Sequence, residues 1–293
     1  MDQRTDLFQR HRKRLLGIAY RMLGSTADAE DVLQDAWLRW NESDTESLRS
    51  AEAWLVTVVT RLAIDRLRVV RAERERYPGF WLPEPVVEPL DEETPQTLLE
   101  RADDISVALL KLLEQLGPEE RAAFVLRQAF DMDYADLAAA LGRSEAACRQ
   151  LVHRAAERVQ AGRPRFTATA ESHRRLLEAF ATAATRGDLH AMAALMTQDA
   201  ALEGDGGGKV RSFDFVLQGA RRIAQLYYAL ARRHAGDMEY RLVRVNGEIG
   251  LARFMAGALE SVQAFEFEGD RIRAIHVQRN PDKLVRAGLV TGR

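Results

Sequence analysis

Proline is concentrated in one stretch of this chain. Of the eight prolines among its 293 residues, five lie between residues 74 and 104: Pro78, Pro83, Pro85, Pro89 and Pro95. Proline lacks a backbone N–H and its ring clashes with the preceding helical turn, so no long helix crosses this stretch. The stretch is also acidic, because residues 73–105 hold 10 acidic and 3 basic side chains. The sequence therefore predicts an acidic, proline-rich linker at residues 73–105.

The residues on the N-terminal side of this linker are predicted to be all-helical. Apolar residues recur at helical spacing between residues 7 and 40, with an interruption near residue 24, so two helices are expected there. Ser25 or Thr26 is expected to cap the second of them. A polar loop precedes a third helix, predicted over about residues 51–71.

The residues on the C-terminal side of the linker have two different patterns, one before and one after Pro164. Residues 105–160 again have helical spacing, and Pro118 is placed to start a helix. After Pro164, helices are predicted over about 172–186, 189–196 and 214–233, followed by alternating segments. Asn246-Gly247 is a strong hairpin signal between two of these segments, and residues 262–277 read as another hairpin. The last third of the chain is therefore predicted to be α+β.

Composition excludes several classes of protein. The chain has 42 basic and 44 acidic side chains and 46% hydrophobic residues, values that are typical of a water-soluble globular protein. No apolar run approaches the ~18 residues needed to cross a bilayer. The N-terminal segment is charged throughout and does not resemble a signal peptide. Cys148 is the only cysteine, which excludes an internal disulfide. We therefore expect a cytoplasmic protein without a membrane partner.

Residues 134–155 have the pattern of a helix-turn-helix. Gly142 supplies the turn, Ser144 can cap the second helix, and Cys148, Val152 and Ala155 recur on one side of it. The opposite side carries residue types that read base edges and bind phosphate: Arg149, Gln150, His153 and Arg154. Residues 141–165 also hold six arginines against two glutamates. Taken alone, this pattern fits either a DNA-binding helix or a helical hairpin with a polar face.

Two further segments precede the helix-turn-helix. Residues 28–39 (DAEDVLQDAWLR) form an acidic helix, and residues 54–68 (WLVTVVTRLAIDRLR) form a helix with one apolar side. On the second of these helices, Arg61 and Asp65 lie one turn apart, a spacing that allows an ion pair. The order of these three motifs resembles that of a bacterial extracytoplasmic-function sigma factor. The resemblance covers residues 1 to about 162.

This resemblance implies both a fold and a function. Residues 1–72 would be the all-α sigma region 2 and residues 106–163 the all-α sigma region 4, and the protein would bind RNA polymerase core and direct promoter-specific transcription initiation. The polar loop before the third helix would help to melt the −10 element, and Leu151 departs from the family pattern, in which a basic residue is common. The residues expected to bind core polymerase are Asp28, Glu30, Asp31, Gln34 and Asp35. Those expected at the −10 promoter element are Thr57, Arg61, Arg66 and Arg68. Those expected at the −35 element are Arg143, Ser144, Arg149, Gln150, His153 and Arg154.

Three short motifs resemble the markers of sigma factors with a fused SnoaL-like domain: WLPEP at 81–85, DGGGK at 205–209 and NPDKL at 280–284. The resemblance implies that residues 166–293 form a cone-shaped α+β barrel that regulates the sigma regions in place of a separate anti-sigma factor. Trp81 is expected to fill a pocket on this domain or between it and the sigma regions. The residues expected to act in this regulation are Trp81, Leu82, Pro83, Asp205, Gly206, Gly207, Gly208, Lys209, Asn280, Pro281, Asp282 and Lys283.

The C-terminal domain leaves two classes of function open. Six side chains are candidates for an acid or base in a pocket: Asp199, Glu203, Asp205, Tyr227, Tyr228 and His276. Catalysis needs such groups to converge at tuned pKa values, whereas a shared fold is a poor guide to chemistry. We therefore expect regulation or the sensing of a small hydrophobic ligand, with no metal, no cofactor and no enzyme activity. The rival hypothesis is a stand-alone helix-turn-helix regulator with a ligand-binding or isomerase-like C-terminal domain.

Overall fold

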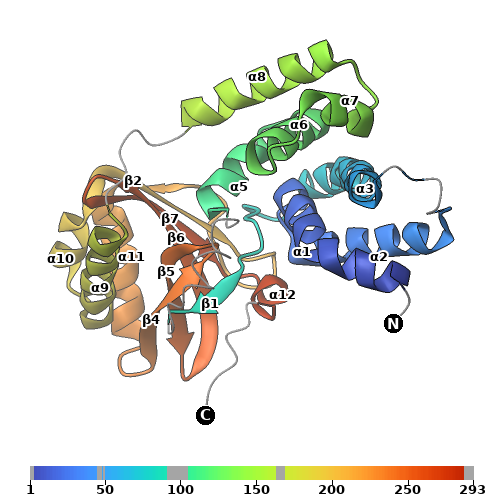
Figure 1. Ribbon diagram of the computed structural model, residues 1–293. Helices are drawn as coiled ribbons and strands as arrows, with labels where there is room; N and C mark the ends of the chain where they lie inside the picture. Colours follow the sequence, from blue (N-terminus) through green and yellow to red (C-terminus); the bar gives the residue numbers. More distant parts are fainter. Residues whose placement is uncertain (1–2, 45–47, 49, 91–104, 163–168, 287–293) are drawn as a thin grey trace. The chain divides into compact units, whose positions relative to one another are not determined.

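The computed structural model describes residues 3–44, 48, 50–90, 105–162 and 169–286 (Figure 1). The chain divides into two compact units. The first comprises Met1–Arg76 with Leu109–Arg163, and the second comprises Tyr77–Ala108 with Pro164–Arg293. Residues 91–104 of the predicted linker, and parts of the polar loop before the third helix, lie outside the described residues. None of the helices in the described ranges is long and apolar enough to cross a membrane.

Three helices make up the N-terminal part of the first unit: α1 (Gln3–Leu23), α2 (Thr26–Glu42) and α3 (Ala51–Arg74). The predicted cap is confirmed, because the Ser25 side chain accepts a hydrogen bond from the Asp28 amide at 3.2 Å. Ser50 caps α3 in the same way. Burial of apolar side chains such as Leu15, Ile18 and Leu55 removes apolar surface from water and holds the three helices together.

Four helices make up the rest of this unit: α5 (Val107–Glu114), α6 (Pro118–Ala129), α7 (Tyr134–Leu141) and α8 (Glu145–Gly162). The predicted helix-turn-helix is confirmed as α7 and α8. Gly142 ends α7 with φ 62°, a left-handed conformation that glycine adopts without strain. Ser144 accepts a hydrogen bond from the Ala147 amide at 3.2 Å and so caps α8.

The second unit combines a mixed sheet with helices. Its strands are β1 (Val87–Pro89), β2 (Met196–Asp205), β3 (Leu217–Gln218), β4 (Met238–Val245), β5 (Glu248–Met255), β6 (Ala258–Glu268) and β7 (Arg271–Gln278). Their order is β1-β4-β5-β6-β7-β2-β3, with β2 parallel to β7 and the other pairs antiparallel. The edge strands β1 and β3 do not pair with each other, so the expected barrel is an open sheet.

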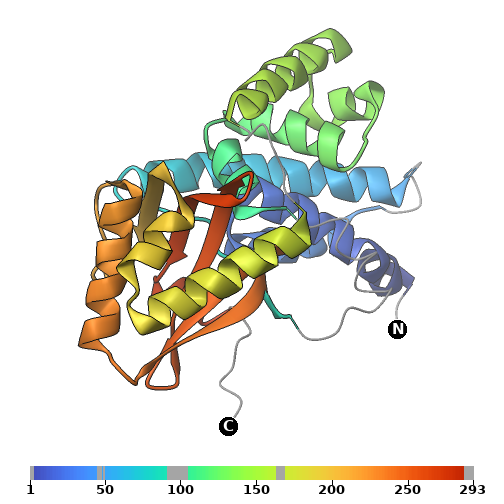
Figure 2. The ribbon, with the colours of Figure 1, turned by 90° about the vertical axis from the view of Figure 1, so that its left-hand side faces the viewer.

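Helices cover one face of this sheet. They are α9 (Ala170–Arg186), α10 (Leu189–Ala194) and α11 (Ala220–Arg233), seen on the same side of the sheet in Figures 1 and 2. Phe180, Tyr227 and Phe265 are buried between the helices and the sheet. A smaller apolar cluster lies on the opposite face, where Val87 of the linker packs with Val243 and Val262. The helix α12 (Pro281–Leu284) follows β7.

The hairpins were predicted better than the strand β2. Asn246 and Gly247 have φ values of 52° and 81° between β4 and β5, which confirms the predicted turn. The helix predicted to reach residue 196 ends at Ala194 instead, because Met196 begins β2 and is buried in the sheet. The helix predicted from residue 214 begins at Ala220, because residues 217–218 pair with β2 as β3.

Candidate polymerase, promoter and regulatory interfaces

The acidic side chains of α2 form an exposed face. Glu30, Asp31, Gln34 and Asp35 are exposed, as expected for a polymerase-binding surface. Asp28 is different, because it is half-buried and forms an ion pair with Arg66 of α3 at 2.7 Å. Four of the five predicted side chains therefore share a solvent face, while the fifth holds α3 against α2.

The predicted −10 residues of α3 fall into two groups: two contact α2 or α3 itself, and two contact α6 or α7. Thr57 bonds to the Ala53 carbonyl within its own helix, and Arg66 is held by Asp28. Arg61 instead donates to the carbonyls of Ala140, at 3.1 Å, and of Ala139, at 3.2 Å, at the C-terminal end of α7. Arg68 lies 3.4 Å from Glu119 of α6.

The Arg61–Asp65 pair that the spacing allows is not formed between these two described residues. Asp65 pairs with Arg68 at 2.9 Å instead. Arg61 reaches the C-terminal end of α7 because the unpaired carbonyls and the macrodipole at a helix C-terminus favour a cation. A contact between distant parts of the chain has displaced the local one.

A buried charged group links the two sets of helices in the first unit. The Arg121 side chain is 1% exposed, and it forms an ion pair with Glu114 at 2.5 Å and donates to the Arg21 carbonyl at 2.9 Å. Glu114 also pairs with Arg74, which in turn donates to the Leu23 carbonyl. Arg71 of α3 donates to the Leu116 carbonyl at 3.1 Å. These contacts, together with those of Arg61, hold α3 against α5, α6 and α7.

This buried charged group was not predicted from the sequence. No role was assigned to Arg121 from the sequence, because an arginine in a helix is ordinarily exposed. The apolar neighbours of Arg121, from Ala122 to Leu126, are all buried, and that continuous run is the one local signal that this part of α6 is enclosed.

The predicted −35 residues share the outer face of the helix-turn-helix. Arg149, Gln150, His153 and Arg154 are exposed, while Cys148, Val152 and Ala155 are buried as predicted. Several of the exposed cations have acidic partners within the first unit. The pairs are Arg149 with Glu145 at 2.7 Å, Arg143 with Glu119 at 2.9 Å and Arg154 with Glu120 at 3.3 Å. The Ser144 hydroxyl oxygen caps α8 by accepting from the Ala147 amide.

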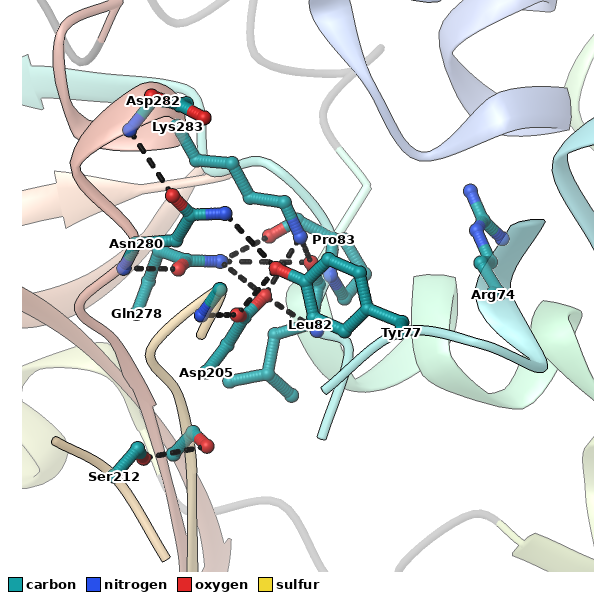
Figure 3. A network of polar contacts seen from close by, with 12 residues as sticks. Arg74, Tyr77, Leu82, Pro83, Asp205, Ser212, Gln278, Asn280, Asp282 and Lys283 are labelled. Carbon is teal, nitrogen blue, oxygen red and sulfur yellow. Dashed lines mark hydrogen bonds and ion pairs between the residues drawn. The ribbon is translucent and has the colours of Figure 1, made fainter. Parts of the chain in front are cut away.

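In the second unit, Asp205 is the centre of a polar network (Figure 3). Its side chain is fully buried, and one oxygen accepts bonds from the Tyr77 hydroxyl at 2.7 Å and the Gly207 amide at 3.0 Å. The other oxygen accepts from the Leu82 amide at 3.0 Å and lies 2.6 Å from the Lys283 ammonium. Burial, and the hydrogen bond to Asp205, raise the pKa of the Tyr77 hydroxyl, so Tyr77 stays a neutral donor.

The same network holds the linker by its backbone. Lys283 donates to the Leu82 carbonyl at 2.6 Å, and the Gln278 side chain lies 3.4 Å from the Pro83 carbonyl. Trp81 is half-buried, and its ring lies beneath the Lys283 ammonium at 4.4 Å, a cation–π contact within the second unit.

Farther along, the linker becomes part of the sheet. Val86 donates to the Asn246 side chain at 3.1 Å and accepts from the Asn246 amide at 2.8 Å. Val87 then begins β1, which pairs with β4 at the sheet edge. Pro89 is tolerated there because an edge strand can leave one side unpaired.

The glycine loop packs tightly against its neighbours in the second unit. A Cβ on Gly207 would lie 2.4 Å from the Asn280 side chain, and one on Gly208 would lie 2.6 Å from Pro78. Asn280 donates to the Tyr77 hydroxyl at 2.9 Å and caps α12 by accepting from the Asp282 amide. Pro281 occupies the first turn of α12, and Lys209 forms an exposed ion pair with Asp282 at 2.5 Å.

Three residues of this network were absent from the prediction: Tyr77, Asn246 and Gln278. Gln278 stands two residues before the NPDKL motif, whereas Tyr77 stands four residues before the WLPEP motif. Asn246 was recognised only as a turn residue. No local pattern reveals that its side chain and amide would bind a segment 160 positions earlier.

The six acid and base candidates do not form a single cluster, although Glu203 and His276 are in contact. His276 lies on the sheet face opposite the helices, between Glu203 and Glu266, each 2.7 Å from one ring nitrogen. Both ring nitrogens of His276 are therefore engaged with carboxylate side chains. Tyr227 is buried on the helix-covered face and bonds to Gln263 at 2.8 Å, while Asp199 and Tyr228 are exposed. Asp205 is engaged with the linker.

Polar side chains are also buried on the helix-covered face. Tyr240, Arg253 and Ser261 stand opposite one another on β4, β5 and β6, and Gln263 is two residues from Ser261. Among the described residues, Tyr240 Oη, Ser261 Oγ and Gln263 Nε2 are buried without a hydrogen-bond partner. Within the same described ranges, no group of three or more His, Cys, Asp or Glu side chains is placed to hold a metal ion.

Comparisons with known proteins agree with this arrangement. Two family models match, Sigma-70 region 2 over residues 7–73 and Sigma-70, region 4 over residues 106–159. The ECF RNA polymerase sigma factor SigJ of Mycobacterium tuberculosis is 37% identical over 94% of this chain and 91% of that protein. The probable ECF sigma factor SigI of the same species is 30% identical over 94% and 92%. The crystal structure of M. tuberculosis SigJ matches with a TM-score of 0.77 and 34% identity, over 98% of this chain and 100% of that one.

A chain that carries sigma regions 2 and 4 in this order has the two modules that define a sigma factor. This chain belongs to the extracytoplasmic-function (ECF) RNA polymerase sigma factors. Its function is to bind RNA polymerase and direct initiation at specific promoters. A stand-alone helix-turn-helix regulator is not favoured, because residues 7–73 match sigma region 2. The SnoaL-like α+β assignment of the C-terminal domain agrees with the SigJ match, which extends over nearly the whole chain.

Proposed function

We propose that the exposed face of α2 binds core polymerase, that α3 binds the −10 element and that α8 binds the −35 element. The observation that carries this proposal is the different environment of the polar residues on α2. Asp28 forms an ion pair with Arg66 of α3, whereas Asp31, Gln34 and Asp35 are exposed to solvent. Exposed acidic side chains on a rigid helix suit electrostatic docking on a basic partner.

The test is run-off transcription with core polymerase and D31K/D35K, compared with D237K/D270K, which reverses two exposed charges in turns of the second unit. We expect the α2 variant to lose transcription and association with core polymerase, and the control to retain both. Equal activity of the two variants would contradict the assignment of α2.

We further propose that the first unit is a closed resting form. Arg61 and Arg68 of α3 are occupied by α7 and Glu119, so the side chains assigned to the −10 element are not free to meet DNA. Polymerase would shift the equilibrium toward an open form by binding that form more tightly. Two fluorophores, one on α2 and one on α8, should then move apart when core polymerase is added to the full-length protein.

The second unit would regulate this opening by holding the linker, in place of a separate anti-sigma factor. The linker connects α3 to α5, and the contacts with Asp205, Lys283 and Asn246 reduce the length of linker that is free to extend when the two sets of helices separate. We expect W81A to change promoter output without unfolding either unit, because Trp81 is half-buried and contacts Lys283. Unchanged output with a released linker would count against this role.

We also propose that the second unit senses a small hydrophobic ligand and has no enzyme activity. Aromatic side chains line the helix-covered face, where the orphan polar atoms of Tyr240, Ser261 and Gln263 would meet a polar group on the ligand. Thermal-shift screening followed by turnover assays separates the alternatives: binding without turnover supports sensing, and turnover refutes it. The site of action would be the cytoplasm, where polymerase resides.

A further inference from the structure

The outer face of α11 carries an unusual concentration of positive charge. The helix has the sequence ARRIAQLYYALARR, which contains four arginines and no acidic residue. All four side chains are exposed: Arg221, Arg222, Arg232 and Arg233. Within the described part of the chain, none of them has a hydrogen-bond or ion-pair partner. We refer to these four side chains as the α11 arginines.

Several exposed arginines on other helices of the protein are paired within their own helix. In α9, Arg174 pairs with Glu178 at 3.1 Å and Arg175 with Glu171 at 3.0 Å. In α8, Arg149 pairs with Glu145 at 2.7 Å. These are the i,i+4 pairs that ordinarily neutralise a solvated helix face. Because α11 has no such carboxylates, its charge remains available to a partner.

The position of two α11 arginines also opposes helix stability. Arg221 and Arg222 stand in the first turn, where the helix macrodipole favours negative charge. Gly219 precedes them and supplies no side-chain cap. Local rules of this kind are broken most often at functional positions.

The spacing of these side chains matches an extended anionic partner. Arg221, Gln225, Tyr228 and Arg232 are separated by four, three and four residues, so they form one stripe along the helix. The stripe is about 16 Å long, a length over which duplex DNA carries about ten phosphates on its two strands. Tyr228 is 41% exposed. Arginine, glutamine and tyrosine side chains all commonly donate to phosphate oxygens.

We propose that the outer face of α11 binds the phosphate backbone of duplex DNA next to the promoter elements. We choose DNA as the partner because its charge is complementary to the stripe and because the protein acts on promoter DNA. The stripe offers unpaired hydrogen-bond donors and has no apolar centre, which suits phosphate groups better than an apolar protein surface. The contact is independent of sequence and adds affinity that falls steeply with salt. This inference concerns a surface outside both sigma regions and outside the linker network.

The test is fluorescence anisotropy of polymerase holoenzyme on a labelled promoter duplex with long flanks, at salt from about 50 to 200 mM. The variant is R221Q/R232Q, and the matched control is R174Q/R175Q, which removes two paired arginines from α9. Loss of two phosphate contacts lowers the salt slope of log K by up to about 1.8. Across this salt range, wild-type holoenzyme should therefore lose about tenfold more affinity than the variant does. The control should keep the wild-type slope.

Two outcomes would overturn the proposal. One is a salt slope for R221Q/R232Q equal to that of wild type, with circular dichroism confirming that the variant is folded. The other is weakened association with core polymerase while DNA affinity is unchanged, which would assign the α11 arginines to an acidic protein surface. Transcription from a duplex trimmed close to the promoter elements should be unaffected by the variant, so failure here is distinguishable from failure of the sigma function itself.

Discussion

Asp205→Asn is the substitution that should release the linker most selectively. Asp205 is fully buried and its carboxylate accepts from Tyr77, Gly207, Leu82 and Gln278, in addition to its ion pair with Lys283. Asparagine keeps the size of the side chain but replaces one acceptor oxygen with an NH₂ group that faces other donors. Lys283 would keep its charge at a site where its side chain is 12% exposed.

The magnitude follows from the burial of this pair. Removing one partner of a buried ion pair costs about 3–5 kcal/mol, because the remaining charge is left uncompensated. A change of that size raises the population of the released linker by about 10²-fold to about 5 × 10³-fold. Tyr77→Phe removes one hydrogen bond to a charged group and should cost about 1.5–3 kcal/mol. Lys209→Ala breaks an exposed pair and should cost at most about 1 kcal/mol.

Hydrogen exchange on the full-length protein measures this directly. The Val86 and Asn246 amides report linker docking, and the amides of β5 and β6 report folding of the sheet. We expect protection of the docking amides to fall in the order D205N, Y77F, K209A, while β5 and β6 stay protected. If the Val86 amide is protected as strongly in D205N as in the wild type, the reasoning is refuted. A larger loss of amide protection in K209A than in D205N would also refute it.

Three further predictions concern stability. Glu114→Gln should destabilise the first unit by about 3–5 kcal/mol, because it leaves the buried Arg121 guanidinium uncompensated; urea unfolding measures this, and a loss below about 1 kcal/mol would contradict it. Burial alone would raise the pKa of Glu260, but the attraction of Arg253 and Arg279 outweighs burial and lowers it. The stability from this carboxylate is therefore present above its ordinary pKa of 4.5 and is lost as pH falls through the lowered value; thermal unfolding should show a flatter acid limb for E260Q than for wild type. Gly207→Ala should lower the melting temperature more than Gly236→Ala, since both have positive φ but a Cβ meets Asn280 only at Gly207; equal effects would contradict the close packing.

The helices and the helix-turn-helix were predictable because their signals are local. Apolar spacing, the glycine at 142 and the serine at 144 act within a few residues, and each is found where it was expected. The turn at Asn246-Gly247 was predictable for the same reason. The DGGGK and NPDKL motifs singled out Asp205, Asn280 and Lys283, whose regulatory role stays a prediction, but they did not reveal the contacts that these residues make.

The unpredicted features depend on contacts between distant residues. Val87 pairs with Val245 in the sheet, although the prolines around β1 marked it as part of a linker. Arg121 is buried because Glu114 and the Arg21 carbonyl neutralise it, and no periodicity within α6 reveals those partners. Arg61 prefers the end of α7 to Asp65 for a similar reason. In each case the partner of the residue is determined by tertiary packing, which outweighs the preference set by local spacing.

The central claim is that α2, α3 and α8 direct core polymerase to a start site. Run-off transcription with purified core polymerase, full-length protein and its promoter tests this claim most directly. The account predicts a single defined transcript that requires both core polymerase and this protein, and that disappears with D31K/D35K but not with D237K/D270K. Failure of the folded protein to associate with core polymerase at any salt concentration, with the linker docked or released by D205N, would contradict it.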